Sequence, residues 1–123
     1  MMLPTDGVLL RIFIGEADRY DKQPLYEWII TEAKARGLGG ATVLRGLMGF
    51  GANSRVIHTF KIERLSEDLP IIVELVDTSE KIEAFLAYIE QHIQCGWLAT
   101  TEQTRIRFYR GETTAKSRTD AQG

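Results

Sequence analysis

The chain has 123 residues, of which 44% are hydrophobic and 26% are charged. This is the size and balance of one globular domain, and it argues against a disordered chain. The formal net charge of −2 gives no strong positive field that would attract nucleic acid. Cys95 is the only cysteine of the sequence, so no intrachain disulfide can form. No apolar run approaches the roughly 20 residues of a membrane helix, and the N-terminal segment lacks a signal peptide's basic region. We therefore expect a cytoplasmic protein that binds no nucleic acid and does not insert into a membrane.

The first elements are predicted from short apolar patterns. Residues 7–14 are almost continuously apolar and predict a buried strand, which a polar loop at 16–23 follows. Pro24 suits the first turn of a helix, in which Leu25, Ile29 and Ala33 recur at helical spacing. Gly37 provides a typical helix end.

The second half repeats this order of elements. Residues 41–48 predict a strand, and the stretch at 50–69 is long and largely polar. A third strand is predicted at 70–76 and a last one at 97–110, with a tail at 111–123 that we expect to be disordered. Between these strands lies a helix with a regular apolar stripe formed by Ile82, Phe85, Leu86, Ile89 and Ile93.

The order βαββαβ is that of the ferredoxin-like sandwich, an α+β fold whose antiparallel sheet carries two helices on one face. We assign this domain to residues 1–110. The first and third strands are apolar at nearly every position, more than a sheet with one solvated face would be. We therefore expect other subunits to bury the second face. Arg11, which interrupts the first strand, is expected to pair with an acid such as Glu74.

Six glycines occur between residues 37 and 51, at positions 37, 39, 40, 46, 49 and 51. They do not form a Walker A loop, because no Gly-Lys-Ser/Thr follows at the required spacing. They do not form a Rossmann fingerprint either, because none begins a helix after a strand. One interpretation is turn geometry and a helix cap. The other is close approach of a ligand to the backbone, with N–H groups turned outward to bind an anion.

Several motifs together resemble the PII-like family of uncharacterised proteins, in the PII signal-transduction superfamily. They are LRIFIGEADR, PLYEWI, GLGGATVLRGLMGFGANSRVIHT and LSEDLPIIVELVD, and the likeness covers about residues 8–108. The Met-Gly-Phe-Gly at 48–51, followed by a polar loop, is similar to the Lys-Gly-Phe-Gly segment and T-loop of PII proteins.

The resemblance implies a homotrimer that binds an adenine nucleotide (AMP, ADP or ATP) in each cleft between subunits. It also implies that the T-loop, here 52–68, docks on a partner protein, often a membrane transporter. Candidate docking residues in this loop are Arg55, His58 and Lys61.

The resemblance also implies a set of nucleotide-binding residues. Thr42 matches a threonine on the adenine side of the PII cleft. Gly49 and Gly51, with Phe50 between them, match glycines on its phosphate side, and Asn53 takes the place of a PII glutamine. Arg107 and Arg110 fall near arginines that contact phosphates. Arg45 is a further candidate on chemical grounds, because a guanidinium suits bidentate phosphate contact; a cross-strand ion pair is the alternative.

This chain departs from the PII pattern in ways that concern the ligand. Met48 replaces the lysine, and only residues 94–97 occupy the place of the glycine-rich B-loop that holds phosphates in PII proteins. A mononucleotide or another small anion is therefore favoured over ATP.

The regulator that the resemblance implies is not expected to be an enzyme. Two alternative functions remain open. A small enzyme could use Arg45, His58 and Glu102 in the cleft, and a ligand-free adaptor would bind only a protein partner. The acids at 16, 18 and 21 lack EF-hand spacing, and His92 with Cys95 provides only two ligands. We therefore expect no metal site.

Overall fold

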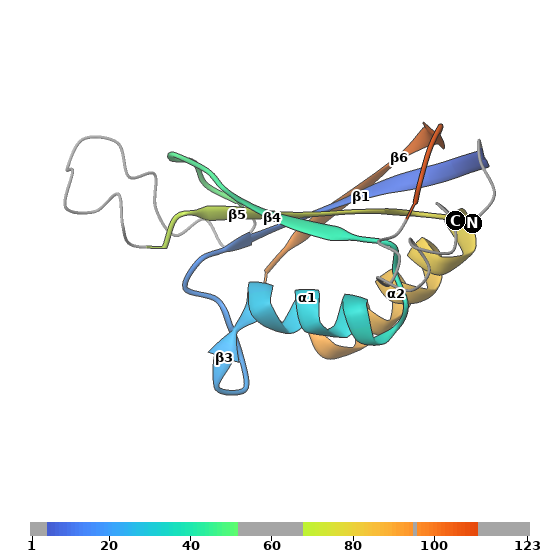
Figure 1. Cartoon of the computed structure of the whole chain (residues 1–123). Coiled ribbons are helices and arrows are strands. Elements are labelled where there is room, and N and C mark those ends of the chain that lie inside the picture. The colour runs from blue at the N-terminus through green and yellow to red at the C-terminus, as the bar shows by residue number, and fades with distance from the viewer. Residues whose placement is uncertain (1–4, 52–67, 95, 111–123) are drawn as a thin grey trace, which may run out of the picture.

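The computed structural model describes residues 5–51, 68–94 and 96–110. Four strands form an antiparallel sheet in the order β4-β5-β1-β6, and both helices lie on one face of it (Figure 1). The strands of this sheet are β1 (Thr5–Gly15), β4 (Ala41–Arg45), β5 (Pro70–Asp77) and β6 (Leu98–Ile106). The helices are α1 (Leu25–Ala35) and α2 (Ser79–His92). This is the predicted ferredoxin-like arrangement, which is confirmed.

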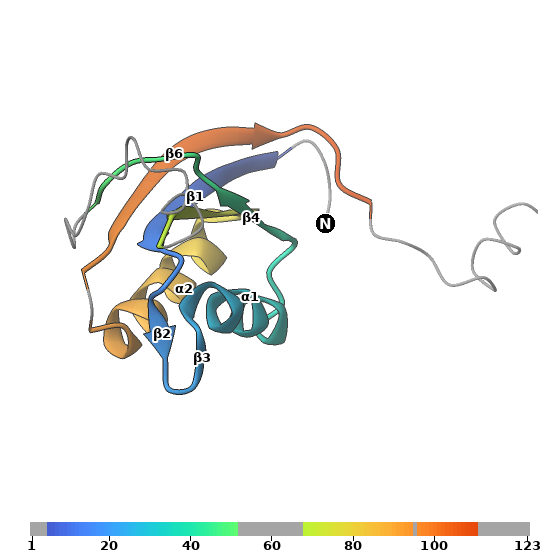
Figure 2. The same ribbon diagram turned by 90° about the vertical axis from the view of Figure 1, so that its left-hand side faces the viewer.

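The core fills the space between the sheet and the helices, which lie side by side beneath it (Figure 2). Strand β1 alternates strictly, so that its even-numbered residues from Val8 to Ile14 face the helices. The predicted stripe of α2 packs against them, and only Leu86 of its five residues is half-buried rather than buried. The buried core consists of Val8, Leu10, Ile12, Ile14, Leu25, Trp28, Ile29, Ala33, Ile71, Val73, Leu75, Ile82, Phe85, Ile89 and Ile93.

The opposite face of the sheet is apolar around a charged centre. The pairing of β1 with β5 places Arg11 opposite Glu74, and its Nε donates to Glu74 Oε2 at 2.9 Å. A second nitrogen of Arg11 donates to Glu102 Oε1 at 2.9 Å. The pairing with Glu74 is thus confirmed, and the hydrogen bonds to Glu74 and then Glu102 raise the pKa of Arg11 above its ordinary value. Leu44 and Leu98 on this face are 43% and 52% exposed.

Two predicted strands are shorter than expected. The strand predicted at 41–48 ends at Arg45, because its partner β5 begins at Pro70 and the Gly46 N–H donates to the Pro70 carbonyl at the end of the ladder. The strand predicted at 97–110 ends at Ile106, opposite the first residue of β1. In both cases the length of a strand is set by its neighbour.

The polar stretch at 16–23 contains a small hairpin that the sequence pattern does not reveal. Its strands are β2 (Arg19–Tyr20) and β3 (Gln23–Pro24), joined through Asp21, which has a φ of +57°. Gly37 ends α1 as predicted, with a φ of +81°. In the described ranges, neither helix has the length and apolar character that crossing a bilayer would require.

Candidate functional site

A hollow of about 460 Å³ lies at the beginning of β4, and we call it the β4 pocket. It combines a threonine hydroxyl, a carboxylate, two aromatic rings and the bare backbone of two glycines, a mixture typical of small-molecule sites. Its lining residues are Gly39, Gly40, Ala41, Thr42, Glu74, Val76, Ile106, Phe108 and Tyr109.

The β4 pocket is assembled by strand register and by a return of the chain. Thr42 lies opposite Glu74 in the ladder, so both side chains are on the open face of the sheet. After β6 the chain turns back toward the connection between α1 and β4 (Figure 1). There the Tyr109 hydroxyl donates to the Gly39 carbonyl at 2.9 Å. The aromatic wall of the pocket therefore consists of Phe108 and Tyr109, which follow β6, the edge strand on the opposite side of the sheet from β4.

A buried carboxylate holds the glycine side of this pocket. Asp77 is 2% exposed, and its Oδ2 accepts a hydrogen bond from the Gly39 N–H at 2.8 Å. Its Oδ1 accepts from the Thr78 N–H at 2.6 Å. A buried carboxylate that accepts backbone N–H groups is a strong anchor, because its bonds are charge-assisted.

The second group of predicted residues lies at the other end of β4. The segment after β1 meets the end of β4 and residues 68–69 here, and we call this region the loop base. Arg45 Nη2 contacts Glu16 Oε2 at 2.5 Å. On the other side, the Ala17 N–H donates to Asp68 Oδ1 at 2.9 Å, and the Glu16 N–H donates to the Leu69 carbonyl at 2.7 Å.

Arg45 is therefore engaged in an ion pair, although not with the neighbouring strand. Its partner Glu16 has one buried oxygen, Oε1, with no hydrogen-bond partner among the described residues. The Arg45 side chain itself is 59% exposed. A guanidinium held in this way can still offer donors to a ligand from solvent.

The structure thus divides the predicted nucleotide site between two ends of one strand. Thr42 lines the β4 pocket, and Arg107 and Arg110 flank its two aromatic residues. Arg45 lies at the other end of β4, three residues or about 10 Å along the strand from Thr42, and Gly49, Phe50 and Gly51 follow it toward the border of residues 52–67. Outside the described residues are Asn53, Arg55, His58, Lys61 and most of the 52–68 loop, as is the tail at 111–123.

Three residues of this region were not predicted as part of the site. Glu74 carries a signal in the sequence, because it interrupts an apolar strand as Arg11 does. Asp77 lies just after the third predicted strand, and Tyr109 was predicted only as part of the strand at 97–110; their meeting at Gly39 depends on where the chain returns. Of the residues named for the enzyme alternative, Glu102 is on edge strand β6 and Arg45 on the opposite edge strand β4, so they could meet only between subunits, where that alternative places its cleft.

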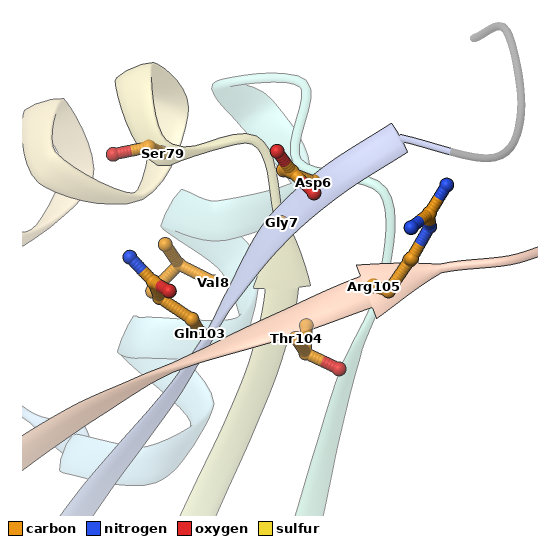
Figure 3. Close-up of a pocket in the computed structure, with 7 residues that line it drawn as sticks. All are labelled: Asp6, Gly7, Val8, Ser79, Gln103, Thr104 and Arg105. Carbon is orange, nitrogen blue, oxygen red and sulfur yellow. The ribbon is translucent and has the colours of Figure 1, made fainter.

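A second hollow of about 420 Å³ lies where β1, β6 and the start of α2 meet (Figure 3). Val8 and Gln103 project on one side of the two strands and Thr104 on the other (Figure 3). Its lining includes Asp6 and Arg105 but none of the predicted site residues. Among the described residues, no three acidic, histidine or cysteine side chains are placed to hold a metal ion together.

A family model matches residues 7–106, which is most of the chain. The chain belongs to the DUF190 family. The description of this family is "Uncharacterized ACR, COG1993". The chain is 42% identical to a UPF0166 protein of Aquifex aeolicus over 82 residues, covering 67% of this chain and 77% of that protein. It is 34% identical to a UPF0166 protein of Methanocaldococcus jannaschii over 105 residues, covering 85% and 94%.

Solved structures with the same fold are PII-like proteins, as the sequence resemblance predicted. A candidate PII-like signaling protein of Thermus thermophilus superposes with a TM-score of 0.60 at 18% identity, covering 86% of this DUF190 chain and 94% of that one. CPII of Thiomonas intermedia, bound to ADP and bicarbonate, superposes with a TM-score of 0.54 at 16% identity, covering 87% and 97%. The predicted PII-like, ferredoxin-like fold is thus confirmed.

Proposed function

We propose that this DUF190 protein is a non-enzymatic, PII-like regulator that binds an adenine nucleotide or a similar small anion along β4. The observation that carries the proposal is the placement of two complementary sites on that one strand. The β4 pocket offers aromatic and polar groups suited to a heterocyclic base. The loop base offers the Arg45 guanidinium beside glycine backbone.

The spacing of these sites suits a small nucleotide. Thr42 and Arg45 are about 10 Å apart along the strand, and their side chains point to opposite faces of the sheet. A nucleotide with its base in the β4 pocket and a phosphate at Arg45 would therefore pass around the free edge of β4. The Thiomonas structures contain ADP with bicarbonate, or ADP with AMP and bicarbonate, which supports this class of ligand. We favour AMP or ADP over ATP, because Arg45 is shared with Glu16 and only residues 94–97 lie where PII proteins have a B-loop.

We further propose a homotrimer in which the open faces of three sheets cover one another. Leu44, Val76 and Leu98 are between 39% and 52% exposed on this face. Burial of apolar surface stabilises an assembly by roughly 25 cal/mol per Å², so leaving these side chains in water is unfavourable. The cleft between subunits would then run along the edge strands, beside the β4 pocket.

The 52–68 loop is proposed to dock on a partner protein, with a membrane transporter as the first candidate and Arg55, His58 and Lys61 as contacts. Its C-terminal residue Asp68 accepts a hydrogen bond from Ala17 at the loop base, next to the Arg45–Glu16 pair. A ligand that contacts Arg45 would therefore act directly on the anchor of the loop. In this proposal the protein works in the cytoplasm.

Calorimetric titration of the purified protein with AMP, ADP and ATP tests the proposal. Light scattering should show a trimer, and at least one nucleotide should give a saturable heat. Arg45→Ala should weaken that binding about 10-fold, because a charge-assisted contact is worth about 1.5 kcal/mol or more. Arg19→Ala, an exposed arginine in the hairpin, is the matched control and should bind as the unmodified protein does. Flat traces from a folded trimer would contradict nucleotide sensing.

A further inference from the structure

We propose that Asp77 and Tyr109 are positioning residues that hold residues 107–110 as a wall of the β4 pocket. We call this segment the strap. The attachment itself is read from the structure, whereas its effect on a ligand rests on the function proposed above. The two parts are therefore tested by separate measurements.

The strap is joined to the domain at one clear point. It follows β6, whose pairing with β1 ends at Ile106, so it has left the sheet. Phe108 is 67% exposed and lies beneath the guanidinium of Arg110, whose Cζ is 4.9 Å from the ring centroid. The hydrogen bond from the Tyr109 hydroxyl to the Gly39 carbonyl then fixes the strap to the connection between α1 and β4.

Gly39 is held from both sides at this point. Its N–H donates to the buried carboxylate of Asp77, and its carbonyl accepts from Tyr109. A Cβ placed on Gly39 would lie 3.4 Å from Tyr109 Cε1 and 3.5 Å from Asp77 Oδ2, so there is little free space between the two side chains. Asp77 therefore fixes the position of the carbonyl that Tyr109 must reach. Removing either side chain should loosen the same attachment.

The attachment matters to a ligand because the strap supplies part of the pocket. Phe108 and Tyr109 line the hollow on one side, and Thr42 and Glu74 line it on the other. A ligand that contacts both sides binds the attached state more tightly than the detached state, and so favours attachment. The strap also carries Arg107 and Arg110, whose charges favour the attached state when the ligand is an anion. Attachment and ligand binding are thus expected to be coupled in both directions.

The attachment can be measured without any ligand by limited trypsin digestion. Trypsin cleaves after arginine, and mass spectrometry reports cleavage after Arg107 and after Arg110 separately. Tyr109→Phe and Asp77→Asn should each raise the rate of these cleavages roughly 2- to 10-fold, the range expected when one hydrogen bond is lost. The double variant should be cleaved no faster than the faster single variant, because both changes release the same attachment. Tyr26→Phe, a half-buried tyrosine of α1, is the control and should leave the rates unchanged.

Each outcome decides one part of the proposal. Unchanged cleavage in Tyr109→Phe, or additive effects in the double variant, would overturn the shared attachment. Tyr109→Phe keeps this test valid if Asp77→Asn fails to fold, because Tyr109 is 44% exposed and its ring is retained.

The effect on the ligand is measured by titrating the same variants with AMP and ADP. Two- to 10-fold weaker binding by Tyr109→Phe supports a role for the strap as a pocket wall, and unchanged affinity overturns that role. If neither nucleotide binds even the unmodified protein while cleavage responds as expected, the nucleotide proposal fails and the attachment stands.

Discussion

Two glycines of the same stretch should respond in opposite ways to the same substitution, alanine. At Gly46 a Cβ would lie 2.8 Å from Cγ of Pro70 and 3.4 Å from the Pro70 carbonyl oxygen. The proline ring is bonded to the backbone at both ends and cannot swing aside. The Gly46 N–H is also bound to that carbonyl at 2.7 Å, so the two chains cannot separate without losing the bond.

Two opposing effects determine how Gly46→Ala changes the free energy of unfolding. Overpacking of this kind costs about 1–3 kcal/mol. Replacing glycine by alanine also restricts the unfolded chain, which offsets about 0.4–1 kcal/mol. We expect Gly46→Ala to lower the free energy of unfolding by about 0.5–2 kcal/mol, or the melting temperature by roughly 2–8 °C for a domain of this size.

Gly40 is the matched control, because a Cβ there would meet nothing within 4 Å and its φ is not in the left-handed region. Only the restriction of the unfolded chain remains, so Gly40→Ala should raise the melting temperature by roughly 2–4 °C. Thermal unfolding by circular dichroism at one fixed protein concentration measures both variants. Equal melting temperatures for the two variants would refute the steric account of Gly46.

Gly40 also separates the two interpretations of the glycine stretch. It lines the β4 pocket, so a methyl group there would occupy space that a ligand could use. A more stable Gly40→Ala protein that binds AMP or ADP less tightly would indicate that the bare backbone serves the ligand. A more stable protein with unchanged affinity would leave turn geometry as the reason for this glycine.

Three further results are expected. Leu98→Asp, which places a charge on the open face, should convert the proposed trimer to monomers in light scattering; a trimer that persists in this variant would place the subunit contact elsewhere. Glu16→Gln, which releases Arg45 from its ion pair, should raise the affinity for ADP about 3- to 10-fold by calorimetry, and equal affinities would show that Glu16 does not compete for the guanidinium. Arg11→Ala leaves the carboxylates of Glu74 and Glu102 without their shared cation, so it should lower the midpoint of denaturant unfolding, whereas Arg11→Lys, which keeps the charge, should lower it less. In the unmodified protein the pKa of Arg11 is raised, so its contribution persists below its ordinary pKa and would be lost only at far higher pH. Equal unfolding midpoints for the alanine and lysine variants would refute the charge argument.

The predicted nucleotide site was partly assembled by the fold and partly left outside the described residues. Thr42 was predicted on the adenine side and lies in a pocket with two aromatic rings. Arg45 was predicted either to bind a phosphate or to form an ion pair, and in the structure it forms an ion pair with Glu16. The docking residues Arg55, His58 and Lys61 stay predictions, as do the trimer and the nucleotide.

The sequence by itself determined the two helices and the four strands of the main sheet, and the buried side of α2. Strand β1 is apolar at nearly every position, so the sequence predicts the strand but not which of its faces packs on the helices. Apolar residues recur at helical spacing in α2, and this periodicity arises from local backbone geometry alone. Gly37 ended its helix as predicted for the same reason, because the left-handed conformation required there is a property of one residue.

Only the tertiary structure decided where strands end and which distant residues meet. Strand β4 stops at Arg45 because β5 begins at Pro70, which is a property of the pair and not of either strand. The contact between Tyr109 and Gly39 joins residues 70 positions apart, and Asp77 reaches the same glycine from 38 positions away. Local patterns do not encode such meetings, because they depend on the register of whole strands and on the path by which the chain returns to the sheet.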